Sequence, residues 1–187
     1  MPAIAGTATG QPSPGEIREH GLIRFNDLVG LLEQRLESLL DCAPHTRERR
    51  RGVPHVPVPH KPGVYLFTES GNHRYVGRAK NLNARFGQHV APKSHENQAA
   101  FAFNIARRDA EESDFHVSGR DRKALDRDPD FNERFFGPAK ARVRAMEFRF
   151  VVFDPDMNDV DALSTIFEVY ASLLLGTEGD FNLFATH

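Results

Sequence analysis

The sequence predicts an α+β fold in which a small three-stranded sheet, mixed or antiparallel, is flanked by helices, with a further helix near the N-terminus. Two strands are indicated at residues 63–67 and 73–78, where apolar residues alternate on either side of the turn-forming stretch TESGN. A third strand is expected between Arg142 and Phe153, where Met146, Phe148, Phe150 and Val152 alternate with other residues. Apolar residues at helical spacing predict helices before, between and after these strands.

The N-terminal helix is predicted from FNDLVGLLEQRLESLLDC, with Asn26 as its N-cap. Its heptads are too few for a dimerisation zipper, so we interpret it as a helix lying on the domain. Asn81 is expected to cap a helix that reaches about Val90, and the segment SHENQAAFAFNIARRDAE predicts the next one.

Later helices are less regular. FNERFF predicts a short helix that ends at Gly137-Pro138, and a last helix is expected from Val160 to about Leu175.

We divide the chain into a disordered tail (1–15), a helix with a basic, proline-rich connector (16–60), and a main domain (61–187) whose residues 91–145 form a helical and irregular insertion. The run RERRR at 47–51 is interpreted as a solvated part of the connector.

The composition is that of a soluble globular protein: 187 residues, 40% hydrophobic and 27% charged. A single cysteine, Cys42, excludes an internal disulfide framework and favours a reducing compartment. No stretch is apolar enough for a membrane helix, and the N-terminus lacks a signal-peptide pattern, so a cytoplasmic protein without a membrane partner is expected.

The formal net charge is −2, which argues against bulk electrostatic binding of nucleic acid. The charge is unevenly distributed, however. Residues 73–93 contain five basic residues and no acid, whereas residues 147–187 contain eight acids and only one basic residue, Arg149. This basic segment favours a phosphate-bearing partner; its basic residues are Arg74, Arg78, Lys80, Arg85 and Lys93.

Two of the three tyrosines lie in the predicted hairpin. If the five-residue loop closes a regular hairpin, Tyr65 lies opposite Tyr75 and both share one face, while Val64, Leu66 and Val76 share the other. We take the apolar trio as the core face, which leaves the tyrosine face available for chemistry. Tyrosine also favours strands, so packing remains an alternative role.

Glu168 lies on the predicted last helix, away from an apolar stripe that contains Leu163 and Phe167. Periodicity alone indicates an ordinary solvated glutamate. The histidines lack zinc-ligand spacing, and the sequence contains neither a phosphate-binding glycine loop nor a nucleophile elbow.

Five elements in order resemble the GIY-YIG nuclease superfamily, most closely a stand-alone bacterial type. They are GVY at 63–65, YVG at 75–77, Arg85 eight residues after Gly77, Glu168 on a late helix, and Asn182 near the chain end. Valine replaces isoleucine in both tripeptides, and Arg78 stands where relatives often have lysine. The resemblance spans roughly residues 61–184.

The resemblance implies a metal-dependent DNA endonuclease. Glu168 would be the single protein ligand of Mg²⁺ or Mn²⁺, an oxygen ligand of the kind magnesium prefers. Tyr65 would act as, or orient, the general base, with Tyr75 beside it and His89 as a second base. Arg78 and Arg85 would bind the scissile phosphate, and their charge would lower the tyrosine pKa. Asn182 would support the metal site, while Gly63 and Gly77 belong to the motif.

Alternatives remain at this level. The same fold could bind DNA or a branched structure without cutting it, and an interaction protein built on the N-terminal helix would explain its leucines but not the motif. The substrate, whether duplex, branched or single-stranded DNA or RNA, and the oligomeric state both stay open. If Tyr65 acts in hydrolysis, Tyr65→Phe is expected to abolish cutting with little loss of stability.

Overall fold

A computed structural model describes residues 14–47, 57–154 and 160–178. The chain divides into two compact units, residues 1–34 and 35–187. Helix α1 (Pro14–Asp41) begins in the first unit, and its residues from Arg35 onward belong to the second. Asn26 therefore lies inside this helix and is not its N-cap, because the helix begins at Pro14, twelve residues before Asn26. The tail at residues 1–13 and most of the basic connector, residues 48–56, lie outside the described residues.

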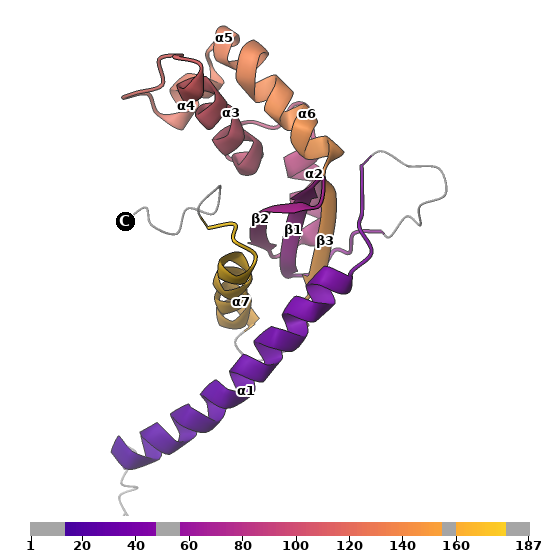
Figure 1. The fold of residues 1–187 in the computed structure, drawn as a ribbon, viewed down its shortest axis with the longest axis vertical. Helices are drawn as coiled ribbons and strands as arrows, with labels where there is room; N and C mark the ends of the chain where they lie inside the picture. Colours follow the sequence, from indigo (N-terminus) through magenta and orange to yellow (C-terminus); the bar gives the residue numbers. More distant parts are fainter. Residues whose placement is uncertain (1–13, 48–56, 155–159, 179–187) are drawn as a thin grey trace, which may run out of the picture. The chain divides into compact units, whose positions relative to one another are not determined.

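The second unit is built on a three-stranded antiparallel sheet with the order β2-β1-β3 (Figure 1). The strands are β1 (Gly63–Glu69), β2 (Asn72–Ala79) and β3 (Glu147–Val152). The α+β class, the two hairpin strands and the third strand are confirmed. The hairpin turns at Ser70 and Gly71, which both have positive φ (51° and 82°) as a tight hairpin turn requires.

Helices cover both faces of the sheet. On one side lie α2 (Leu82–Val90), α3 (Ala100–Glu112) and α6 (Gly137–Ala145), whose apolar residues form one cluster with Tyr65, Phe67 and Phe148. On the other side α7 (Val160–Leu174) packs against β1 and β2 (Figure 1). Val64, Leu66 and Val76 are buried as expected, but the tyrosine face is also core. The expectation that only the apolar trio forms a core face is wrong, because helices cover both sides of the sheet.

The insertion is mostly helical. Between α3 and α6 lie α4 (Arg122–Asp126), α5 (Pro129–Phe131) and the π-helical segment η1 (Asn132–Phe136). The helix predicted to end at Gly137-Pro138 does not end there, because η1 continues directly into α6. Proline at the start of α6 lacks the N–H that an α-helix would require, and the wider turn of η1, in which the Gly137 N–H bonds to the Asn132 carbonyl, accommodates it. Residues 142–145, expected in the third strand, are therefore helical.

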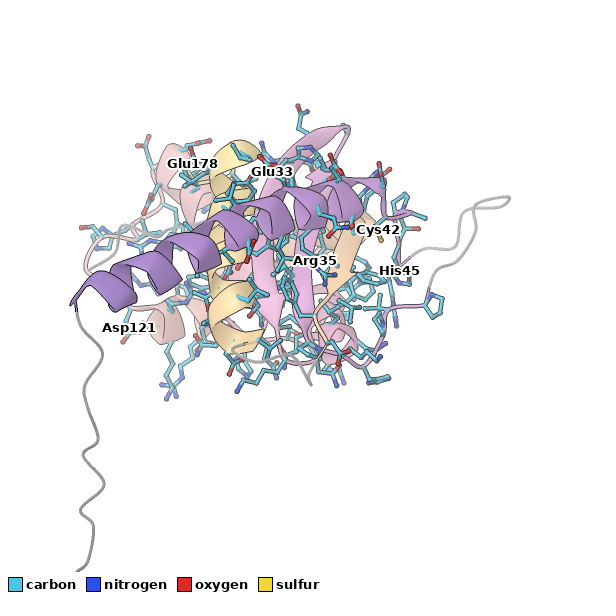
Figure 2. The ribbon with its side chains drawn as sticks, turned by 90° about the horizontal axis from the view of Figure 1, so that it is seen from below. Glu33, Arg35, Cys42, His45, Asp121 and Glu178 are labelled. Carbon is cyan, nitrogen blue, oxygen red and sulfur yellow. The ribbon has the colours of Figure 1, made fainter. Side chains whose placement is uncertain are left out.

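The segment after α1 extends the sheet by one isolated bridge. His45 exchanges two backbone hydrogen bonds of 2.8 Å with Phe148 of β3, and its ring meets the Phe86 ring edge-on at 4.8 Å. Nearby, Nη1 of Arg35 donates to the Val152 carbonyl at 3.3 Å (Figure 2 labels Arg35 and His45). Among the described helices, none is both long and apolar enough to cross a membrane.

Candidate active site

The hairpin register places the two tyrosines diagonally. Tyr65 pairs with Gly77, and Tyr75 pairs with Phe67, so the tyrosines share a face without being directly opposite. The register shifts between Phe67 and Thr68, which leaves Arg74 as an extra residue in β2. The expectation that Tyr65 lies directly opposite Tyr75 is therefore wrong. The register differs because β2 contains this bulge and because the turn is shorter than five residues.

Gly77 must be glycine because the Tyr65 ring lies over it. A Cβ atom at position 77 would lie 2.5 Å from the Tyr65 hydroxyl oxygen and 2.9 Å from Cε1 of Tyr75. Gly63 is equally constrained, because a Cβ there would overlap the Val151 carbonyl oxygen and approach the Leu82 side chain to 2.7 Å. Both motif glycines therefore allow close packing, Gly77 against the tyrosine pair and Gly63 against β3 and α2.

The Tyr65 hydroxyl is held by two residues of α2. Nε2 of His89 lies 2.8 Å from it, and Nε of Arg85 donates to it at 3.3 Å. Asn81 fixes the start of this helix, since its side chain accepts a hydrogen bond from the Ala84 N–H at 2.9 Å. Arg85 and His89 are four residues apart and so project from the same side of α2 toward Tyr65.

Burial dominates the protonation of these groups. Desolvation raises the pKa of Tyr65 well above its ordinary value and also raises that of Tyr75, although Arg85 opposes the shift in both. Tyr75 is half-buried. The expectation that arginine charge lowers the tyrosine pKa is therefore wrong in direction: the nearby charge acts as expected, but burial outweighs it.

His89 is fully buried and neutral. Burial lowers its pKa well below the ordinary value, and the positive charge of Arg85 lowers it further. Its Nδ1 atom has no hydrogen-bond partner among the described residues. A neutral imidazole with one nitrogen at the Tyr65 hydroxyl can accept a proton from it.

Glu168 comes to the site from the opposite face of the sheet. It projects from α7, and its Oε2 atom lies 3.1 Å from Nε of Arg78 at the end of β2. Its side chain is only 18% exposed, so it is not the solvated glutamate that periodicity indicates. The reason is that the buried face of α7 is rotated from the predicted stripe. Leu163 and Phe167 are buried together with Ala171, whereas Ile166, Leu173 and Leu174, which helical spacing also places in the stripe, are exposed.

The carboxylate of Glu168 has the chemistry of a ligand for Mg²⁺. Burial raises the pKa of Glu168, and Arg78 only partly opposes this shift, so an ionised Glu168 is short of compensating positive charge. The described residues contain no group of three or more His, Cys, Asp or Glu side chains that could hold a metal ion. A single carboxylate suits Mg²⁺, which keeps most of its water ligands, and does not suit zinc.

The other predicted basic residues are placed differently. Arg74 pairs with Glu69 near the hairpin turn (3.6 Å), and Lys80, which is largely exposed, lies 3.7 Å from Asp161 in the first turn of α7. Lys93 is exposed in the segment after α2. Asn182 lies outside the described residues, and its support of the metal site stays a prediction.

Sequence reasoning missed the contribution of residues 88–101. Nη1 of Arg85 donates to Oε1 of Gln88 and to the Gln98 carbonyl, both at 3.0 Å. The Phe101 ring stacks on Tyr75 with centroids 4.7 Å apart and planes 13° apart. The start of the insertion thus holds Arg85 and Tyr75 in place. The apolar pattern of α3 predicted packing, but no local signal indicates which residues it packs against.

Comparison with known proteins agrees with this geometry. A family model described as the GIY-YIG catalytic domain matches residues 61–168, more than half of the chain, so the chain belongs to the GIY-YIG family, whose members are generally endonucleases that act on DNA. The chain is also similar to UvrABC system protein C of Bartonella quintana (strain Toulouse), with 45% identity over 42 residues. That match covers 22% of this chain and 6% of the relative. No solved structure matches the chain.

Proposed function

We propose that this chain is a metal-dependent DNA endonuclease that hydrolyses phosphodiester bonds at the site formed by Tyr65, Arg85, His89, Arg78 and Glu168. The observation that supports this most directly is the Tyr65 hydroxyl, which contacts a neutral imidazole on one side and a guanidinium on the other. Phosphodiester hydrolysis needs an activated water and compensation of charge on the phosphoryl oxygens. This pair of neighbours supplies both.

Proton transfer follows from the 2.8 Å contact between Tyr65 and His89. Because burial keeps Tyr65 protonated, a free tyrosinate is not the base. The Tyr65 oxygen accepts a proton from the attacking water while its own proton passes to Nε2 of His89. This transfer requires the His89 tautomer that carries its proton on Nδ1, and it leaves the imidazole positively charged beside the phosphate.

Two arginines compensate the charge on the phosphate, and they differ in how firmly their side chains are held. Arg85 is held by Tyr65, Gln88 and the Gln98 carbonyl, so its guanidinium is pre-organised. Arg78 is 41% exposed and can turn from Glu168 toward a bound phosphate. Glu168 would hold Mg²⁺ or Mn²⁺, which when bound polarises the phosphate and stabilises the departing oxygen.

A cleavage assay tests the proposal. Native protein, Glu168→Ala and the exposed-site control Glu111→Ala would be incubated with plasmid, branched and single-stranded DNA, with and without Mg²⁺ or Mn²⁺. We expect metal-dependent cutting by native protein and the control, and loss of cutting in Glu168→Ala. DNA that is bound by native protein but never cut would contradict the proposal and favour a binding module of the same fold.

A further inference from the structure

A pocket of about 580 Å³ lies on the other side of the helix that carries Arg85 and His89. It is lined by residues of α2 and the segment after it, by Arg144 of α6, and by Arg47. Within α2, residues 83, 86, 87 and 90 share one side, and Arg85 and His89 share another. Between these two sides lies a ridge formed by Ala84, which is exposed, and Gln88, which is partly exposed.

The pocket is positively charged. None of the described residues that line it is acidic, and in the described part of the chain neither Arg47 nor Arg144 forms an ion pair. Several other arginines are paired, as Arg142 is with both carboxylate oxygens of Glu69 at 2.6 Å. The proposed active site does not use these two guanidinium groups.

Both arginines are positioned by backbone structure. Nε of Arg144 donates to the Val90 carbonyl at 3.0 Å, which leaves the outer guanidinium nitrogens for other partners. Arg47 follows His45 by two residues, and His45 is fixed to β3 by its two 2.8 Å backbone bonds. Pro92, which lines the pocket, is held by Lys140, whose Nζ donates to the Pro92 carbonyl at 3.0 Å.

We propose that this pocket, defined by Arg47 and Arg144, binds a backbone phosphate of duplex DNA on the strand opposite the one cleaved at Arg85. The two phosphate sites are separated by the width of α2, about 10–12 Å for a helix with its side chains. The major groove of duplex DNA is about 12 Å wide and admits a helix. With the Ala84–Gln88 ridge facing the groove, Arg85 contacts one backbone and the pocket contacts the other. This inference rests on the proposed DNA substrate.

Equilibrium binding without metal tests it independently of cleavage. Fluorescence anisotropy would measure the binding of labelled duplex and single-stranded DNA by native protein, Arg47→Ala, Arg144→Ala and the double variant, over a series of salt concentrations. The matched control is Arg107→Ala, which removes one charge from α3, where Arg107 is paired with Glu111 at 3.1 Å. Circular dichroism would verify folding, and Arg47→Ala keeps the test valid if Arg144→Ala does not fold, because Arg47 is exposed.

We expect each variant to weaken duplex binding on the order of tenfold and to lower the slope of log K against log salt by about 0.9, with about 1.8 for the double variant. Single-stranded DNA should be bound as by native protein. Changes no larger than those of Arg107→Ala would overturn the proposal, as would equal losses with single-stranded and duplex DNA. If no protein cuts DNA but these binding differences appear, the pocket stands and the endonuclease proposal fails.

Discussion

Arg78 and Glu168 form an ion pair, with Nε of Arg78 3.1 Å from Oε2 of Glu168, that joins the end of β2 to the middle of α7. The pair ties α7 to the edge strand of the sheet at the proposed site. Glu168 is largely buried and Arg78 is partly exposed, so the carboxylate loses more hydration than the guanidinium. A buried carboxylate with a raised pKa is a cost to folding that a catalytic role would explain.

Replacing Glu168 with glutamine should therefore stabilise the protein while abolishing cleavage. The raised pKa means that the ionised form is disfavoured in the folded state, and an amide removes this cost, with an expected gain of about 0.5–2 kcal/mol in the free energy of unfolding. Urea unfolding at pH 7 measures it. A clear loss of stability would show that the ion pair with Arg78 outweighs the burial of the carboxylate.

Arg78 should compete with the metal for Glu168. In Arg78→Ala the carboxylate loses its 3.1 Å partner, so Mn²⁺ should bind more tightly at pH 8, while kcat at saturating metal should fall by about 10²–10³ because a phosphate contact is lost. Calorimetric titration and single-turnover kinetics measure the two effects separately. Unchanged Mn²⁺ affinity would mean that the ion pair does not restrict the carboxylate.

Tyr65→Phe should abolish cutting and, contrary to the expectation from sequence, should also destabilise the fold. The substitution leaves Nε2 of His89 without its 2.8 Å partner in a fully buried position, at a cost of about 1–3 kcal/mol. Thermal unfolding and a plasmid-nicking assay test the two parts. A fully active Tyr65→Phe protein would refute the proton relay.

Stability should decline as the solution becomes acidic, in part through His89. Its folded pKa lies below the ordinary value near 6.5, so below that pH the unfolded chain binds a proton that the folded chain does not. The contribution of neutral His89 to the free energy of unfolding is fully present above pH 6.5. Below that pH it falls by at most about 1.4 kcal/mol per pH unit for this proton. His73 also has a lowered pKa, so the comparison needed is native protein against His89→Gln between pH 7.5 and 5. Identical pH profiles would contradict a neutral, buried His89.

Gly77→Ala should destabilise the domain by about 1–3 kcal/mol, because its Cβ would lie 2.5 Å from the Tyr65 hydroxyl. Gly87→Ala is the matched control: its Cβ would meet nothing within 4 Å, and alanine is the better helix former, so stability should rise by about 0.5–1 kcal/mol. Chemical unfolding of both variants would show whether the constraint is specific to Gly77. Equal effects would contradict it.

Local patterns predicted the elements well. The two hairpin strands, the Asn81 cap and the bounds of α7 each depend on residues within a few positions of one another, which the sequence displays directly. The predictions that were wrong depend on contacts between residues far apart in the sequence. Alternation in β1 cannot show that α3 covers the tyrosine face, and the helical pattern of α7 cannot show that Glu168 rather than a neighbour faces Arg78.

For the candidate site too, local features could be predicted from the sequence and features that depend on distant contacts could not. The motif residues could be named from their order in the sequence, and the structure brings Tyr65, Tyr75, Arg85 and His89 into one cluster. The direction of the tyrosine pKa shifts and the support of Arg85 by the Gln98 carbonyl could not be predicted, because both arise from packing of the insertion against the sheet.

The proposed role of Glu168 as the metal ligand of a nuclease is tested most directly by an Mg²⁺ titration of supercoiled-plasmid nicking by native protein and Glu168→Gln. The two side chains have the same shape and differ in charge. We predict nicking that saturates with Mg²⁺ for native protein and none for a folded Glu168→Gln protein at any concentration. Equal nicking by both proteins would contradict the account.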